Sequence, residues 1–556
     1  MFPSEQAPVK HFSFLILCIA AQCFTAGCRE PSMQTVASNA QKTKNYKNRK
    51  ILTPKDFKQP PNSASSEDLD IIARAYDATR SQARTVGGAE DVAVKNVIAA
   101  VHASLELGPT LVVWIIDRTP SSQKITIETV EAAKRFYDDN DVRQFSLGTE
   151  QKLLSTVVAY DEQVDLLLEQ PTGDWKLAKS TLESIQPSAA GKEMTFTAIQ
   201  QTLEKYLAFR TKERREMVLV VVTDEVGDDQ NLLEGLIETT RRNAIPVYVI
   251  GSAAPWGQAN PYAPNPKVAE KKADDSLPTH GPESRFSERV DINMALSSGY
   301  AFGARPNVEL IDSGFGPFSL ERLCRAGGGK FFAIRPEADA TYSYRGTQYV
   351  FWPTGNELRF DPQVVNKYTP DYVSEAEYRR LLTDNAARQA LHNAAQLPRI
   401  AIDEVPDMQF PKVSEAQMKR SLDKAQQYAA THAPAVDKLY AALALGEADR
   451  DRLSGARWQA QFDLAMGRTA AVKARIDGYN SMIAALKRGK EFSNASSKTW
   501  TLEPADAFET ESSLRKLADR AKMYLERVVK EHPGTPWAKI AEEELKAPLG
   551  WTWKEA

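Results

Sequence analysis

The chain has 556 residues, of which 42% are hydrophobic and 26% are charged. This is the composition of an ordinary globular protein, and its length allows about two to four domains. Lys and Arg total 70 against 73 for Asp and Glu, which gives a formal net charge of -3. The balance argues against a nucleic-acid-binding protein, which would show a basic excess or a basic stripe.

The N-terminal residues have the features of a bacterial export signal. An apolar run covers residues 12–24, which is short for a membrane span of roughly 20 residues but suits the hydrophobic part of a signal peptide. The sequence TAGC at 25–28 resembles a lipobox, in which the chain is cut before the Cys and its thiol is lipidated; Thr25 stands where that motif usually has Leu. We predict a signal peptide over 1–28 with lipidation at Cys28. A plain cleaved signal and an uncleaved anchor are the alternatives.

Two segments are predicted between the signal peptide and the first domain. Residues 29–66 are polar and rich in Asn, Lys, Ser and Pro, so they bury too little to fold and we predict a disordered linker. Residues 67–107 carry apolar side chains at helical spacing and are predicted to be a helical lead-in. Three of the four cysteines lie within the signal, so Cys324 is expected to be the lone thiol of the mature protein and no intrachain disulfide is possible.

Residues 108–336 alternate short apolar strands with amphipathic helices. The strands are predicted at 111–117, 217–224, 245–251 and 330–335, and helical spacing is seen at 198–207 and 232–240. Continuous apolar strands that alternate with helices predict a doubly wound α/β fold, with a parallel sheet covered on both faces. An insert rich in Pro, Asn, Ala and Gly interrupts it at 252–308, and a loop this long is usually functional or disordered. Its Trp256 and Tyr262 are the kind of aromatic residues that anchor protein interfaces.

The C-terminal part is predicted to be helical. A mixed extension at 337–412 leads to an all-α domain at 413–556, and its strongest amphipathic helix runs from Leu514 to Val529. Ala521, Leu525, Val528 and Pro533 fall at offsets that resemble the second helix of a tetratricopeptide repeat. An amphipathic helical hairpin explains the same positions.

Two acidic residues end strands of the predicted sheet. Asp117 ends the first strand and is followed by Thr119 and Ser121, and Asp224 ends the second. Ligands of open α/β sheets bind at this carboxyl-terminal edge of the strands. Carboxylates and hydroxyls together are the hard oxygen ligands that Mg²⁺ prefers. The same Asp-x-Thr-x-Ser turn is also found as a simple helix cap, and the nearby pair Asp228-Asp229 is most simply a solvated loop at a helix start.

This arrangement resembles a von Willebrand factor type A domain with its metal-ion-dependent adhesion site. Asp117, Thr119 and Ser121 match the family's Asp-x-Ser-x-Ser loop, with Thr in place of the first Ser, and Asp224 matches the acidic residue of the third loop. The resemblance implies a bound Mg²⁺ or Mn²⁺. In the family the hydroxyls bind the metal directly and the acids often bind it through water. A carboxylate of the partner completes the metal's coordination.

The middle loop departs from the family pattern. Glu193 stands where the family has a Thr, and Thr195 follows two residues later and would replace that Thr only if the loop shifts. The additional carboxylate could strengthen metal binding and weaken the recruitment of an acidic partner, or it could mark a degenerate site in which Asp117 only caps a helix.

We predict an exported, non-enzymatic scaffold that is anchored to a bacterial membrane, in the periplasm or at the cell surface. It would bind a protein or a cell-envelope ligand, and no nucleic acid. A purely structural envelope protein without a metal is one alternative. A metal-dependent hydrolase is another, and it would need a general base from the insert. No catalytic residue is assigned, because the sequence contains no His-Glu-x-x-His, Cys-x-x-Cys or Gly-x-Ser-x-Gly motif.

Overall fold

The chain folds into two compact units in the computed structural model. The structure describes residues 89–147, 151–189, 191–254, 313–334, 341–344, 347–350, 360–398, 406–494, 496–506 and 512–556, together with residues 256, 290 and 400. Among these, 89–253 and 319–334 form the first unit and the others form the second. The predicted signal with Cys28, the linker, the first part of the helical lead-in and most of the insert, including Tyr262, lie outside the described residues.

A six-stranded sheet forms the centre of the first unit, with strand order β3-β2-β1-β4-β5-β6. The neighbouring strands pair in parallel, except that β3 is antiparallel to β2. The strands are β1 (Thr110–Asp117), β2 (Leu153–Tyr160), β3 (Val164–Leu166), β4 (Glu216–Thr223), β5 (Val247–Ser252) and β6 (Lys330–Ile334). The doubly wound α/β fold is therefore confirmed, and β2 and β3 are strands that the sequence analysis did not predict.

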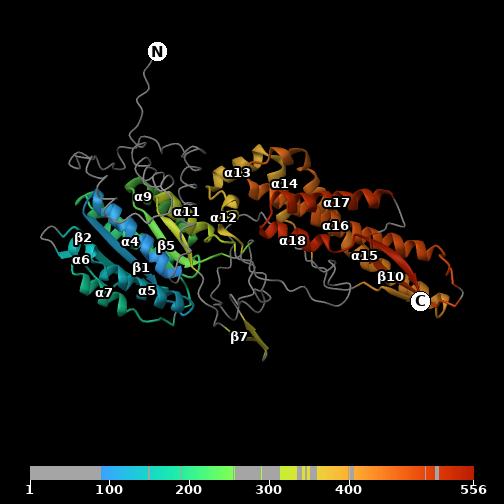
Figure 1. The fold of residues 1–556 in the computed structure, drawn as a ribbon, viewed down its shortest axis with the longest axis horizontal. Coiled ribbons are helices and arrows are strands. Elements are labelled where there is room, and N and C mark those ends of the chain that lie inside the picture. The colour runs from blue at the N-terminus through green and yellow to red at the C-terminus, as the bar shows by residue number, and fades with distance from the viewer. Residues whose placement is uncertain are drawn as a thin grey trace, which may run out of the picture. The chain divides into compact units, whose positions relative to one another are not determined.

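Helices cover both faces of this sheet (Figure 1). The alternating side chains of β1 show the two layers, because Val112 and Trp114 pack into one apolar core and Leu111 and Val113 into another. The first core is closed by α4 (Ala89–Leu107), α5 (Gln123–Asp138), α6 (Asn140–Leu147) and α7 (Trp175–Glu183). The second is closed by α8 (Thr195–Thr211), α9 (Leu233–Asn243) and α11 (Phe318–Gly327), with the short η3 (Gln230–Leu232) before α9. Burial on both faces is the reason that the central strands are largely apolar.

The second unit is mainly helical, as predicted, and contains small antiparallel sheets. Its helices are α12 (Pro362–Val365), η4 (Asn366–Tyr368), α13 (Glu375–Asp384), α14 (Ala386–Ala395), α15 (Glu415–Ala444), η5 (Glu447–Arg452), α16 (Ala456–Lys487), α17 (Ser512–Glu531) and α18 (Pro536–Leu545). A three-stranded sheet consists of β9 (Gln409–Pro411), β10 (Thr499–Ala505) and β11 (Gly550–Glu555), and a hairpin of β7 (Thr341–Tyr344) and β8 (Thr347–Val350).

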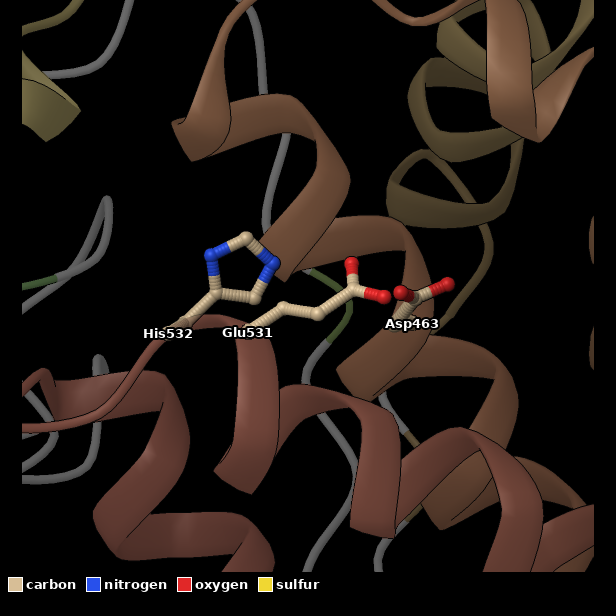
Figure 2. A group of neighbouring side chains, drawn as sticks. All are labelled: Asp463, Glu531 and His532. Atoms are coloured by element: carbon tan, nitrogen blue, oxygen red, sulfur yellow. The ribbon is translucent and has the colours of Figure 1, made fainter.

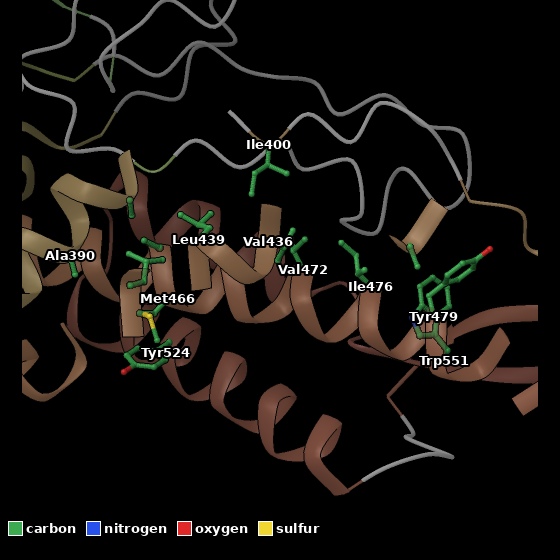
Figure 3. Close-up of a cluster of buried hydrophobic side chains, with 14 of the residues drawn as sticks. Ala390, Ile400, Val436, Leu439, Met466, Val472, Ile476, Tyr479, Tyr524 and Trp551 are labelled. Atoms are coloured by element: carbon green, nitrogen blue, oxygen red, sulfur yellow. The ribbon is translucent and has the colours of Figure 1, made fainter. Parts of the chain in front are cut away.

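The long helix α16 forms the centre of the second unit. It packs against α15 and α17, and its Met466, Val472 and Ile476 belong to the main apolar cluster of this unit (Figure 3). The helices α15 and α16 have 30 and 32 residues, so each is nearly as long as a whole tetratricopeptide repeat of about 34 residues. The apolar face predicted for α17 is buried. The tetratricopeptide-like interpretation of this helix remains a prediction.

Trp256, the first aromatic residue of the insert, is part of the core of the second unit. Its side chain is 6% exposed and lies edge-on to Trp537, with ring centroids 5.3 Å apart. Trp537 in turn stacks on Tyr368. Our interpretation of Trp256 as an anchor for a partner is therefore wrong, because its ring is already covered by the chain's own aromatic residues.

Within the residues that the structure describes, none of the helices combines the length and the apolar character needed to cross a membrane.

Candidate functional site

The two predicted strand-end acids lie at the same edge of the sheet. Asp117 is the last residue of β1, and Asp224 follows Thr223, the last residue of β4. The two strands are adjacent and parallel, with Ile116 opposite Val222. Parallel pairing in this register brings both carboxylates to the carboxyl-terminal edge, where ligands of such sheets bind.

The loop after β1 folds around the Asp117 carboxylate. The Thr119 backbone N–H and hydroxyl both donate to Asp117 Oδ1 at 2.8 Å, and the Thr223 hydroxyl donates to Oδ2 at 3.3 Å. Asp117 is fully buried. Its carboxylate is therefore bound to the loop and to β4. The N-cap of α5 is Ser122, whose side chain makes no capping hydrogen bond.

Glu193 brings a third carboxylate into the same group. Its Oε1 lies 3.1 Å from the hydroxyl of Thr119 and 3.1 Å from that of Ser121, within hydrogen-bonding distance of both, and these two hydroxyls are 3.1 Å apart. Glu193 is only 2% exposed, whereas Ser121 is half-buried. Glu193 Oε2 is buried and has no hydrogen-bond partner among the described residues. The structure thus brings together the three acids and both hydroxyls that the sequence analysis selected.

The three carboxylates are too close to be ionised together without a counter-charge. One oxygen from each of Asp117, Glu193 and Asp224 lies within 4.8 Å of the others. Burial raises the pKa of Asp117 to about 6. Burial, followed by the charges of Asp117 and Asp224, raises the pKa of Glu193 to about 11. The group offers only oxygen atoms as ligands, and one of them, Glu193 Oε2, is buried without a hydrogen-bond partner among the described residues. Such a group of ligands is chemically suited to a hard divalent cation such as Mg²⁺ or Mn²⁺.

Thr195, the other candidate of the middle loop, lies beside a different partner. It is the first residue of α8 and is fully buried. Its hydroxyl is 3.1 Å from the hydroxyl of Tyr160 on β2. A Cβ placed on Gly227, which has φ +84°, would come within 2.7 Å of the Thr195 hydroxyl. This packing holds Thr195 against Tyr160 and leaves Glu193 as the middle-loop residue that contacts the first loop.

The acidic pair after β4 positions the middle loop. The carboxylate of Asp229 accepts from the backbone N–H groups of Phe196 at 3.1 Å and Thr197 at 2.5 Å, at the start of α8. The residue preceding this helix, Met194, supplies no side-chain cap. The Asp228 N–H donates to the Glu193 carbonyl at 2.8 Å. Our interpretation of this pair as a solvated loop is wrong for Asp229, which is buried. The sequence held one signal for this contact. The N-cap residue of α8 is Met194, whose side chain is a poor hydrogen-bond acceptor, so the first N–H groups of the helix need an acceptor from elsewhere in the chain.

A second acidic group in the helical unit has a different character. Asp463 on α16, Glu531 at the end of α17 and His532 lie together, with the Glu531 carboxylate between the imidazole and Asp463 (Figure 2). Arg450 forms ion pairs with both carboxylates, and Arg527 lies 3.5 Å from Asp463. Two guanidinium groups thus balance two carboxylates. Burial lowers the pKa of His532 to about 4, so the imidazole is neutral. The group is therefore an ion-pair network that joins helices. We do not assign it as a cation site, because its carboxylates already have counter-charges.

The family comparison agrees with the fold. The model of the von Willebrand factor type A domain matches residues 112–279, a range that includes Asp117, Glu193 and Asp224. This segment is a von Willebrand factor type A domain. No curated protein sequence matches the chain.

Solved structures that are similar to the chain include other proteins with type A domains. The conserved hypothetical protein BatB from Bacteroides thetaiotaomicron is 18% identical, with 40% of this chain and 90% of that chain covered and a TM-score of 0.23. An aerotolerance-related membrane protein from Bacteroides fragilis NCTC 9343 is 17% identical, with 40% and 91% covered and a TM-score of 0.22. The von Willebrand domain of the pili tip protein Mfa5 from Porphyromonas gingivalis is 16% identical, with 21% and 38% covered and a TM-score of 0.18. Because the identities and TM-scores are this low, the function of none of these proteins is assigned to this chain.

Proposed function

We propose that this protein is a non-enzymatic binding scaffold whose type A domain holds a Mg²⁺ or Mn²⁺ ion and recognises a protein or a cell-envelope ligand. The ion would be bound by Asp117, Asp224 and Glu193 with the hydroxyls of Thr119 and Ser121. The bound ion would supply a fixed positive charge at the edge of the sheet. The first loop orients its two hydroxyls toward the site, and Asp228 and Asp229 hold the middle loop that carries Glu193.

One observation carries this proposal. Three buried carboxylates, each offering an oxygen within 4.8 Å of the others, meet two hydroxyls at the ligand edge of a parallel sheet. Buried like charges are strongly unfavourable unless a counter-charge is present. In the ion-pair network of the helical unit two arginines supply that counter-charge. A divalent cation would supply it here.

We propose further that the protein is exported and anchored to a bacterial membrane through Cys28. The support is the apolar run at 12–24 followed by TAGC at 25–28. A lipid on Cys28 would hold the chain at the periplasmic or outer surface, where the type A domain would meet envelope partners. The recognised partner would then be a protein or an envelope component, and no nucleic acid, since the formal net charge is -3.

The cation site is tested by measuring thermal unfolding of the full chain in Mg²⁺, Mn²⁺ and chelator. A bound cation should stabilise the folded domain by about 2.7 kcal/mol at a concentration of 100 times Kd. Asp117→Ala should abolish this gain, and Glu213→Gln, just beyond the C-terminal end of α8, should retain it. An unfolding temperature that is the same in cation and in chelator would refute the site and favour a metal-free structural scaffold. A pull-down from envelope extracts, with and without chelator, would then identify the partner.

A further inference from the structure

Glu193 differs from the other members of the site, because it comes from a loop in the middle of the domain and contacts both hydroxyls of the first loop. We propose that Glu193 makes this cation site self-sufficient: the chain's own carboxylate takes the place that a ligand's carboxylate would need. The partner would then present a neutral or positively charged group at this edge of the sheet. This inference rests on the proposed cation site.

The first support is where the Glu193 carboxylate lies. Its Oε1 is 3.1 Å from the Thr119 hydroxyl and 3.1 Å from the Ser121 hydroxyl. Its Oε2 is buried, has no hydrogen-bond partner among the described residues, and belongs to a side chain that is 2% exposed. A buried carboxylate oxygen without a donor is the atom a cation would engage. The space in which the two hydroxyls converge is already filled by a carboxyl group of the chain itself.

The second support is the balance of charge. Asp117 and Asp224 alone match the two positive charges of Mg²⁺ or Mn²⁺, before Glu193 is counted. The nearest basic residue of the first loop, Arg118, is bound to Asp161 at 2.8 Å and to Asp165 at 2.6 Å. The loaded site would therefore have no net positive charge with which to attract an acidic ligand, and the two Asp residues beside Arg118 add negative charge to this edge.

The third support is that the backbone of the middle loop is fixed. The Met194 N–H donates to the Asp161 carbonyl at 3.1 Å, and the Asp228 N–H donates to the Glu193 carbonyl at 2.8 Å. Both bonds involve the peptide group that follows Glu193, and on the other side the Glu193 N–H donates to Asp228 Oδ2 at 3.3 Å. A shift of the loop backbone that withdrew Glu193 would break these bonds, so the loop holds the chain's own carboxylate at the site.

Mn²⁺ binding to the full chain, with acetate as the smallest carboxylate ligand, tests the inference. The wild-type chain should bind Mn²⁺ with an affinity that saturating acetate does not raise, and ¹³C-labelled acetate should give no hyperfine coupling to the bound Mn²⁺. Glu193→Thr and Glu193→Ala each open the position, so acetate should strengthen their Mn²⁺ binding by at least about fivefold and should show the coupling. Either variant suffices if the other fails to fold.

The matched control is Glu213→Gln, which alters an exposed carboxylate beyond the C-terminal end of α8. The 17 residues of that helix place it about 25 Å from the site. The control should behave like the wild-type chain. Failure of the wild-type chain to bind Mn²⁺ would overturn the cation site and this inference with it. Mn²⁺ binding that acetate strengthens in the wild-type chain would overturn this inference alone.

Discussion

Replacing Glu193 by Gln should make the cation-free protein more stable at neutral pH. Burial, and then the charges of Asp117 and Asp224, raise the pKa of Glu193 from 4.5 to about 11. At neutral pH its carboxyl group is therefore protonated in the folded chain and ionised in the unfolded chain. Because the folded state binds the extra proton, the free energy of unfolding falls as the pH rises above 4.5, and this loss continues until the folded pKa is reached.

The size of the effect at neutral pH follows from the unfolded pKa alone, provided that the folded pKa stays well above 7. Neutral pH lies about 2.5 pH units above 4.5, and each unit corresponds to about 1.4 kcal/mol, so the cost is about 3.5 kcal/mol. Gln has nearly the same shape, carries no charge, and keeps an oxygen that can accept from Thr119 and Ser121. For a unit of this size, the gain corresponds to an increase of about 7 to 14 °C in the unfolding temperature.

Urea unfolding and calorimetry of the full chain in chelator, from about pH 5 to about pH 8, measure this difference. The first unit's free energy of unfolding should fall in the wild-type chain by up to about 1.4 kcal/mol per pH unit relative to Glu193→Gln. Glu213→Gln should follow the wild-type curve. With saturating Mn²⁺ the advantage of the variant should shrink or reverse, because the wild-type carboxylate then has a counter-charge. Parallel pH curves for the wild-type chain and Glu193→Gln would show that the carboxyl is not held protonated by its neighbours.

Three further outcomes are expected. Asp229→Ala removes the distant cap of α8 and should lower the unfolding free energy of the first unit by about 1 to 2 kcal/mol in urea titrations; an unchanged midpoint would contradict the capping role. Arg450→Met leaves the fully buried Asp463 without its main partner and should cost the second unit about 3 to 5 kcal/mol, visible as a shift of the second unit's calorimetric transition alone. Cys28→Ser should release the protein from membranes or block its processing, and mass spectrometry that finds an unacylated N-terminus at another residue would rule out lipidation there.

Much of the first unit follows from the sequence. Strands buried on both faces are nearly continuous apolar runs, which is why the runs at 111–117 and 217–224 predict a parallel sheet. Parallel strands end at one edge, so Asp117 and Asp224 were predicted to lie together. The segment that forms β2 was missed because Ser155 and Thr156 interrupt its apolar run, and no local pattern shows that both are buried.

The sequence by itself determined the class of fold, the edge at which the acids meet and the hydroxyls beside them, because these depend on the period and direction of single strands. Only the tertiary structure decided the rest. Glu193 joins the site while Thr195 packs against Tyr160. Asp229 caps a helix that begins more than thirty residues earlier in the chain, and Trp256 enters the aromatic core of the helical unit. Each of these contacts joins segments far apart in the chain, and such pairings are selected by the packing of the whole domain.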